Sequence, residues 1–249
     1  MIKGLFKNIF GSQTVEGLDY SSLAVDMHSH LIPGIDDGAK DLEHSMILVR
    51  ALYEMGFKKL ITTPHIMSDF YRNTPEIILE GLEKVRNEIN KESIPITIEA
   101  AAEYYVDDGF VQKLANEKLL TIGKNYLLFE ISYLNAPEQL KEIIFQMQVQ
   151  GYKPIMAHPE RYPYFYKDFS RYKKYRDTGV LMQLNLNSLS GYYGKGAKKI
   201  AEKMIDEGLV DMLGTDTHHE RHLHALSLAC KEKYFQKALE MDLMNKSLF

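Results

Sequence analysis

The chain of 249 residues has a single cysteine, Cys230, and no tryptophan. One thiol cannot form a disulfide within the chain, which is typical of proteins of a reducing compartment. The sequence also lacks an apolar run long enough to span a bilayer, and residues 1–10 lack the uninterrupted apolar core of a secretory signal. These absences predict a cytoplasmic location without a transmembrane segment.

A basic excess is absent as well. The formal net charge is -4, whereas a general nucleic-acid binder normally carries an excess of lysine and arginine. The hydrophobic content of 45 % is enough for a full core, and no Pro/Gly/Ser-rich linker divides the chain. We therefore predict one barrel domain over residues 23–249, preceded by an N-terminal arm, residues 1–22. Membrane or subunit contact by this arm, and an oligomer, are left open.

Short apolar runs alternate with amphipathic patterns along the chain. The strand candidates are residues 23–28, 59–65, 96–104, 126–131, 153–159, 180–186 and 210–216. The helix candidates are residues 41–56, 74–92, 106–118, 137–151, 170–179 and 196–208, and a last helix begins near His224. Strict alternation predicts an α/β fold with a parallel sheet, and closure into a seven-stranded barrel would remove the sheet edges.

Residue types that bind metals gather where these strand candidates end. Five of the nine histidines directly follow an apolar strand run. Barrels place their chemistry at the carboxyl ends of the strands, so these side chains are expected to meet on one face. The candidate ligands are His28, His30, Asp37, His65, Glu103, Glu130, His158, Asp216 and His218.

Imidazole and carboxylate groups suit zinc, iron and manganese, and a carboxylate can bridge two ions. The pair His28 and His30 alone, or the turn Asp36-Asp37-Gly38 alone, can be explained without a metal. The convergence of several strand ends is not explained without a metal, because burying so many ionisable groups together is costly in free energy. The sequence therefore predicts two or three clustered divalent ions, which activate water and stabilise a phosphoryl-type displacement.

Several short motifs follow one another in the order of the predicted strands. They include His28-Ser29-His30 with Asp36-Asp37-Gly38, Thr63-Pro64-His65, Ala157-His158-Pro159-Glu160-Arg161-Tyr162 and Asp216-Thr217-His218. In this combination the sequence, from about Val25 to Arg221, resembles the polymerase-and-histidinol-phosphatase (PHP) superfamily. More narrowly, it is similar to the bacterial manganese-dependent protein-tyrosine-phosphatase branch associated with capsular and exopolysaccharide synthesis.

The resemblance implies a distorted seven-stranded (βα)7 TIM-like barrel with a trinuclear site, manganese first and iron or zinc as alternatives. Arg161 would bind the phosphoryl oxygens, and Arg221 would be the second arginine, although its loop is shorter than in the family. His65 or His218 could assist the leaving group. The first ion would be held by His28, His30, Glu103 and Asp216, the second by Glu103, Glu130 and His158, and the third by Asp37, His65 and His218.

The activity implied by the resemblance is hydrolysis of phosphotyrosine monoesters through attack of a metal-bound hydroxide. The partner would be a phosphotyrosine protein, the tyrosine-rich tail of a bacterial tyrosine kinase that controls capsule synthesis. A cysteine-based phosphatase is excluded, because Cys230 lies in a predicted helix and no arginine follows Arg221 to complete a phosphate-binding loop.

Three other functions stay open at this point. A PHP phosphoesterase could act on a small molecule such as histidinol phosphate or a nucleotide. An amidohydrolase also begins with His-x-His, but commonly uses a carboxylated lysine where this chain has Glu130, and Asp37, His65 and His218 favour the phosphoesterase. A catalytically silent scaffold that docks a kinase would not require the intact ligand set.

Other polar and aromatic residues have simpler interpretations. Asn185 and Asn187 are weak metal ligands, Asp36 is a turn or cap residue, and His44 is a helix-surface residue. The tyrosine-rich segment 161–175 either forms a rim for a peptide or packs on the barrel. Opposite walls are expected from Phe70-Tyr71 and Tyr104-Tyr105, and surface or loop positions from His219, His222 and His224.

Overall fold

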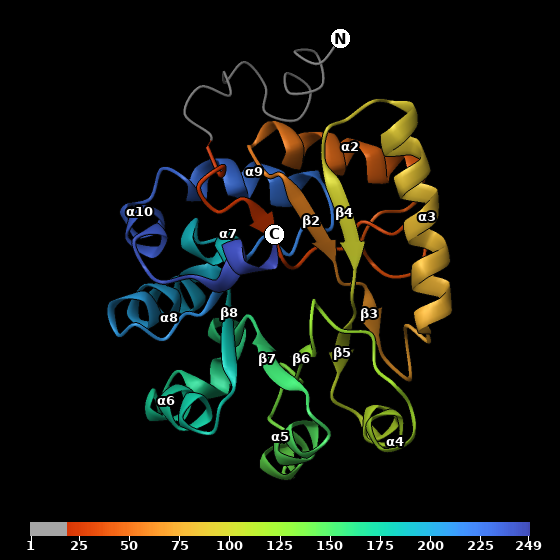
Figure 1. Cartoon of the computed structure of the whole chain (residues 1–249). Helices are drawn as coiled ribbons and strands as arrows, with labels where there is room; N and C mark the ends of the chain where they lie inside the picture. The colour runs from red at the N-terminus through yellow and green to blue at the C-terminus, as the bar shows by residue number, and fades with distance from the viewer. Residues whose placement is uncertain (1–18) are drawn as a thin grey trace.

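A computed structural model describes residues 19–249, in which parallel strands are surrounded by helices (Figure 1). The strands are β1 (Val25–Asp26), β2 (Lys59–Thr62), β3 (His65–Ile66), β4 (Thr97–Ala100), β5 (Glu103–Tyr105), β6 (Tyr126–Glu130), β7 (Lys153–Ala157), β8 (Leu181–Asn185) and β9 (Met212–Gly214). The helices are α2 (Leu42–Glu54), α3 (Pro75–Lys91), α4 (Asp108–Asn116), α5 (Leu140–Val149), α6 (Ser170–Asp177), α7 (Leu186–Leu189), α8 (Gly194–Asp206), α9 (Glu220–Ala229) and α10 (Lys233–Leu239). Three 3-10 turns, η1 (Pro159–Arg161), η2 (Pro163–Phe165) and η3 (Met244–Leu248), complete the set.

Within residues 19–249, none of the helices combines the length and apolarity needed to cross a membrane.

The strands form two sheets, and neighbouring strands within each sheet are parallel. One sheet has the order β1-β2-β4 and the other the order β3-β5-β6-β7-β8-β9. The predicted α/β fold with parallel strands is therefore confirmed. Two of the seven predicted strands are each broken into two, after Thr62 and after Ala100. At the first break stands Pro64, which has no N–H to donate to a neighbouring strand.

The predicted closed seven-stranded barrel is not found in the part of the chain that the structure describes. The segments after β1 and β9 meet in a single parallel bridge, between Ser29 and Thr217. Two hydrogen bonds flank it, from His30 N to Thr217 O (2.9 Å) and from Asp216 N to His28 O (2.7 Å). The strands thus follow one another in chain order through the two sheets, but the ladder of hydrogen bonds is interrupted, because β1 is only two residues long and Pro64 separates β2 from β3.

The helix ends follow the sequence signals. Asp41 caps α2 by accepting a hydrogen bond from His44 N (2.8 Å), and Thr74 caps α3 with Pro75 at its first position. Gly56 follows α2 with φ of 106°, where a Cβ would also lie 2.8 Å from Ser21 N. The last helix begins at Glu220 rather than near His224, and a break after Ala229 separates it from α10.

Alternation along the strands separates two apolar clusters. In β6, Leu127 and Phe129 pack in the large cluster, whereas Leu128 packs with Val25 and Ile155 in the smaller one. A strand turns successive side chains to opposite faces, so Glu130 shares the face of Leu128. The Glu130 carboxylate, at the carboxyl end of β6, therefore lies on the same face of the strand as the smaller apolar cluster.

Both ends of the described chain are tied to the body. Tyr20, which the prediction placed in the N-terminal arm, is buried and donates a hydrogen bond to Leu226 O (2.7 Å). Residues 1–18 of that arm lie outside the described residues. Near the C-terminus, Asn245 in η3 is buried and bonds to the backbone of β1 and β9.

Candidate metal centre

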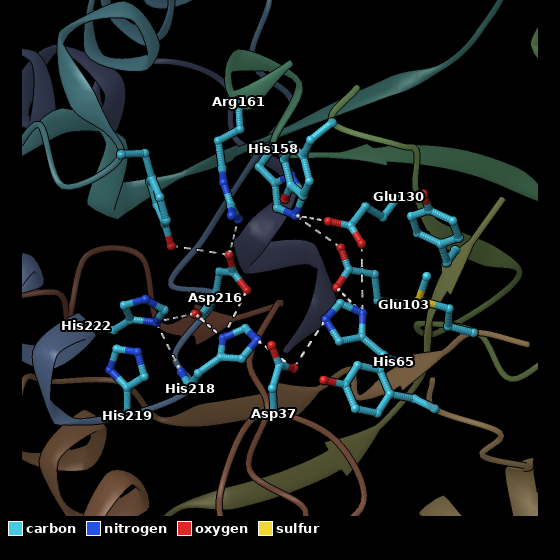
Figure 2. Close-up of a pocket in the computed structure, with 15 residues that line it drawn as sticks. Asp37, His65, Glu103, Glu130, His158, Arg161, Asp216, His218, His219 and His222 are labelled. Carbon is cyan, nitrogen blue, oxygen red and sulfur yellow. Dashed lines mark hydrogen bonds and ion pairs between the residues drawn. The ribbon is translucent and has the colours of Figure 1, made fainter. Parts of the chain in front are cut away.

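A cavity of about 460 Å³ opens at the carboxyl ends of the strands (Figure 2). Its wall contains seven of the nine predicted ligands: Asp37, His65, Glu103, Glu130, His158, Asp216 and His218. The other two, His28 and His30, are fully buried, and their Nε2 atoms lie 3.2 and 3.4 Å from Glu103 Oε2. Side chains from both sheets thus reach one place, as the strand-end pattern predicts.

Within the described residues, four groups of side chains offer donor atoms that all lie within 4.8 Å of one another. Such a spacing allows each group to surround one ion, and each of the nine predicted residues belongs to at least one group. The groups are His28, His30 and Asp216; His28, Glu103 and His158; His65, Glu103 and Glu130; and His30, Asp37, His65 and His218. The predicted convergence is confirmed, while the assignment of each residue to an ion stays a prediction.

Glu103 stands at the centre of these groups. Its Oε2 lies 3.2 Å from both His28 Nε2 and His65 Nδ1, and its Oε1 lies 3.1 Å from His158 Nε2. The two oxygens therefore face different histidines, which is the geometry that a bridging carboxylate needs. Asp37 contacts another pair of histidines, with its Oδ1 3.6 Å from the Nε2 atoms of His65 and His218.

Backbone strain marks two of the strand ends. His158 after β7 and Asp216 after β9 have φ of 33° and 51°, in the left-handed region. Such conformations cost roughly 1–3 kcal/mol each in residues with a side chain and persist only where the surroundings impose them. Ala157, just before His158, packs in the smaller apolar cluster, so regular alternation would turn the His158 side chain to the opposite face of the strand. The left-handed conformation of His158 instead brings its side chain to the cavity.

Burial and neighbouring charges set opposite protonation states in the cluster. Burial opposes ionisation of Glu103, but the adjacent His28 and His65 outweigh it and hold the pKa of Glu103 well below its usual range. For His158, burial and the Arg161 charge lower the pKa to about 4, so its imidazole is neutral near pH 7. Burial and the Glu103 charge raise the pKa of Glu130 to about 8. An ionised carboxylate beside a neutral imidazole is the state in which both can donate to a metal.

Two buried side chains orient the histidines and were not predicted to do so. Asp36 Oδ2 lies 2.8 Å from His30 Nδ1, while Asp36 Oδ1 accepts a hydrogen bond from Gly38 N (2.9 Å). The predicted turn role of Asp36 is therefore confirmed, but it is incomplete. Gln183 Oε1 lies 2.8 Å from His28 Nδ1. Partners on the second nitrogen fix the ring orientation of ligating histidines.

Arg161 lies at the cavity with its guanidinium between two tyrosine rings, 5.0 Å from the Tyr133 centroid and 4.0 Å from that of Tyr193. Its Nη1 donates to Asp216 Oδ2 (2.7 Å). Two further donors converge on this oxygen, Asn185 Nδ2 (2.7 Å) and the Tyr193 hydroxyl (3.4 Å). Asn185, noted as a weak ligand from the sequence, thus positions a predicted ligand.

Arg221, the second predicted phosphate-binding arginine, does not line this cavity. Helix α9 begins immediately after His219, and its first turn carries Arg221 to an exposed position. There it lines a neighbouring cavity of about 430 Å³ together with Lys40 and His44. A phosphate contact by Arg221 therefore remains a prediction without geometric support in the structure.

Two histidines that the sequence placed on the surface are buried. His222 accepts a hydrogen bond from His218 N (3.2 Å) and lines the metal cavity, so it supports a predicted ligand. His44 accepts from Lys40 N (3.1 Å), and its Nε2 lies 3.3 Å from a Glu220 carboxylate oxygen. Only the local periodicity was visible in the sequence, and it does not reveal that α9 packs beside α2. His224 is exposed as predicted.

The aromatic residues divide between core and cavity. Tyr162, Phe165 and Tyr172 of the tyrosine-rich segment are buried, so these rings pack on the body. Tyr104 is buried too, and its expected place in a cavity wall is wrong. Tyr71 and Tyr105 do line the cavity, and the ring of Tyr71 stacks on His65 with centroids 5.6 Å apart.

Comparisons with known proteins identify a family and several similar proteins. The family model of capsular polysaccharide synthesis proteins, CpsB/CapC, matches residues 24–249. Tyrosine-protein phosphatase YwqE of Bacillus subtilis is 28% identical over 237 residues, covering 90% of this chain and 93% of that protein. Tyrosine-protein phosphatase CpsB of Streptococcus pneumoniae is 26% identical over 223 residues, covering 87% and 88%.

Solved structures show the same relationship. A structure described as YwqE from Bacillus subtilis and CpsB from Streptococcus pneumoniae, metal-dependent tyrosine phosphatases, matches with a TM-score of 0.75 at 27% identity. It covers 86% of this chain and 84% of that chain. The phosphotriesterase homology protein of Escherichia coli matches with a TM-score of 0.53 at 13% identity and coverage of 92% and 96%, a likeness of fold alone.

Proposed function

The chain belongs to the CpsB/CapC family of capsular polysaccharide synthesis, and from this membership we propose that it is a metal-dependent protein-tyrosine phosphatase. The observation that carries the proposal is the set of nine converging histidine and carboxylate side chains with Arg161 at the same cavity. Relatives named tyrosine-protein phosphatases match nearly the whole chain. The reaction class is hydrolysis of a phosphoric monoester.

The donor set fits divalent first-row ions. It combines imidazole nitrogens with carboxylate oxygens and contains no thiolate, a set that accepts manganese, iron or zinc. We propose two or three ions, manganese first, with Glu103 as the bridge between the groups. His28, His30 and Asp216 would hold one ion together with Glu103. Glu130 and His158 would hold the second ion, again with Glu103, and Asp37, His65 and His218 would hold the third.

When bound, such ions polarise phosphoryl oxygens and lower the pKa of water so that it can act as a nucleophile near neutral pH. Arg161 would bind the phosphoryl group, because a planar guanidinium matches two of its oxygens. Asn185 and Tyr193 would keep Asp216 Oδ2 paired when Arg161 turns toward the substrate. The tyrosine leaving group has an ordinary pKa of about 10, so His65 or His218 need give it only modest help.

The natural substrate is proposed to be a phosphotyrosine protein, the tyrosine-rich tail of a bacterial tyrosine kinase that controls capsule or exopolysaccharide synthesis. The family match supports a role in capsule synthesis. A cytoplasmic location fits the single cysteine. The bridge between Ser29 and Thr217 supports treating the two sheets as one distorted seven-stranded TIM-like barrel.

Metal analysis combined with turnover of an aryl phosphate tests the proposal. We expect two or more ions per chain, activity that is lost on chelation, and a loss of roughly a hundredfold or more in His30→Ala and Arg161→Ala. His224→Ala is the matched control, because His224 is exposed on α9. Full turnover in His30→Ala would refute the assigned site. A clear preference for histidinol phosphate over phosphotyrosine peptides would replace the proposal with a small-molecule phosphoesterase.

A further inference from the structure

Two large apolar side chains are exposed next to residues that line the metal cavity. Phe70 is 73% exposed and precedes Tyr71, whereas Leu134 is 89% exposed and follows Tyr133. Single exposed apolar residues are common on protein surfaces and need no explanation by themselves. These two differ because each belongs to a short loop whose neighbouring residue faces the cavity.

Hydrogen bonds hold Phe70 at the end of its loop. Met67 and Tyr71 exchange two backbone hydrogen bonds, Met67 N to Tyr71 O (2.8 Å) and Tyr71 N to Met67 O (3.1 Å). Ser68 is fixed to Asp107 through its N–H (2.9 Å) and its hydroxyl (3.1 Å). The stacking of Tyr71 on His65 ties the loop to the metal centre. Phe70 is therefore presented to solvent by a loop with fixed ends.

The loop after β6 holds Leu134 in a similar way. The ring of Tyr133 stacks on His158, with centroids 6.0 Å apart and an interplanar angle of 19°. The Ser132 hydroxyl accepts a hydrogen bond from Leu134 N (3.1 Å), and Ser132 O accepts one from the Tyr164 hydroxyl (2.7 Å). Tyr133 is thereby directed inward and Leu134 outward.

The topology places the two loops at the same edge of the sheet. Strands β3, β5 and β6 are neighbours, and Tyr105 of the middle strand also lines the cavity. The carboxyl ends of parallel strands meet at one edge, so the loops that carry Phe70 and Leu134 lie at the end of the sheet where the cavity opens, next to Tyr71 and Tyr133 of its wall. A phosphotyrosine is joined to its backbone by only a ring and one methylene. The backbone of a protein substrate must therefore pass close to this mouth.

We propose that Phe70 and Leu134 form a docking rim that contacts apolar side chains flanking the phosphotyrosine of a protein substrate. The inference rests on the proposed phosphatase function and adds the surface that favours a polypeptide over a small phosphate monoester. A small aryl phosphate reaches the cavity without touching the rim. The rim therefore contributes to kcat/KM for peptides alone, mainly through KM.

The test is the double variant Phe70→Ser/Leu134→Ser in the full-length, metal-loaded enzyme. Three substrates are compared: p-nitrophenyl phosphate, a phosphotyrosyl peptide with leucine on both sides of the tyrosine, and the same peptide with serine in those positions. We expect kcat/KM for the leucine peptide to fall roughly tenfold or more, since two large apolar contacts are lost. Turnover of p-nitrophenyl phosphate and of the serine peptide should stay within about twofold.

The matched control is Phe145→Ser/Val149→Ser, which removes two side chains of similar exposure, 66% and 68%, from α5. It should leave all three substrates unchanged. The rim is refuted if the leucine peptide is unaffected by the double variant, or if p-nitrophenyl phosphate loses activity to the same extent. A wild-type enzyme that cleaves p-nitrophenyl phosphate but neither peptide overturns the proposed protein-phosphatase function, and the docking rim with it.

Discussion

The carboxylate of Asp36 joins three segments that carry proposed ligands. Its Oδ2 lies 2.8 Å from His30 Nδ1 and accepts a hydrogen bond from His65 N (3.1 Å), and its Oδ1 accepts from Gly38 N, just after Asp37. A proton held on His30 Nδ1 leaves the lone pair on Nε2, which faces the cluster. Asp36 thus sets the orientation of His30 and the backbone positions of His65 and Asp37.

Replacing Asp36 by asparagine keeps the volume and the turn but removes the anionic acceptor of His30. We expect metal affinity to fall roughly 10–100-fold, the usual effect of losing an outer partner of a metal-bound histidine. Titration calorimetry with manganese and metal analysis of the purified variant measure this. Asp41→Asn is the control, since asparagine caps a helix as well as aspartate does. Unchanged affinity in Asp36→Asn would show that the carboxylate serves the turn alone.

The same residue shows where prediction from sequence stops. His65, Glu103 and His158 could be recognised because each ends an apolar run, and a parallel sheet brings such ends together. Asp36 and His222 could not, because their roles depend on which ring nitrogen faces which neighbour. That information appears only after the loops and helix α9 have been packed.

At the scale of elements, Glu160 joins η1 to the β8–α7 junction. The carboxyl is fully buried, and Oε1 accepts hydrogen bonds from Asn185 N (3.0 Å) and the Ser188 hydroxyl (2.6 Å). Burial raises the pKa of Glu160 from 4.5 to about 7. Between these values the unfolded chain has lost a proton that the folded protein keeps. The free energy of unfolding therefore decreases as the pH rises from about 4.5 to about 7.

Glu160→Gln should remove this pH dependence while keeping an acceptor for Asn185 and Ser188. Relative to wild type, the variant should gain roughly 2–3 kcal/mol in unfolding free energy between about pH 5 and about pH 8. Urea unfolding at the two pH values measures the difference. Glu80 is exposed on α3, so the unfolding free energy of Glu80→Gln should change with pH as that of the wild type does. A Glu160→Gln curve parallel to wild type would place the carboxyl in a more polar environment than its burial indicates.

The side chain of Asn245 connects the C-terminal turn η3 to β1 and β9. Asn245 Nδ2 donates to Val25 O (3.0 Å) and Leu213 O (2.7 Å), and its Oδ1 accepts from Leu213 N (2.9 Å). Asn245→Ala leaves buried backbone groups unpaired, so we expect a loss of about 3 kcal/mol in unfolding free energy. The exposed Ser247→Ala is the control. Turnover per folded molecule should not change, because Val25 and Leu213 each lie three residues before the next proposed ligand, His28 and Asp216. A selective loss of turnover would contradict this separation.

Among the elements, the seven strand regions and most helices could be predicted from periodicity and caps. The breaks after Thr62 and Ala100, and the division of the last helix into α9 and α10, could not. Proline at position 64 signals an interruption, but whether the chain bends there or ends a strand depends on its neighbours. A continuous ladder was also expected between the first and the last strand, where the structure has a single bridge between Ser29 and Thr217.

At the scale of the whole molecule, the proposed metal centre lies between the two sheets. His28 and His30 follow β1 of the smaller sheet, whereas Glu103, Glu130, His158 and Asp216 lie on strands β5 to β9 of the larger one or directly after them. In the described residues, the direct backbone link between β9 and the β1 side is the bridge at Ser29 with its two flanking hydrogen bonds. Bound ions would therefore connect sheets that the backbone joins only weakly at this point.

Removing the metal should loosen this junction before the rest of the fold. An ion present at a hundred times its Kd stabilises the folded state by about 2.7 kcal/mol. For a chain of this size, chelation should lower Tm by roughly 5–10 °C per ion. Hydrogen exchange should accelerate at His30 N and Asp216 N, which carry the cross-sheet hydrogen bonds, and stay slow at Ile155 N in the ladder between β6 and β7. Uniform acceleration at all three amides would instead mean that the ions stabilise the molecule globally, and the junction would not be its weak point.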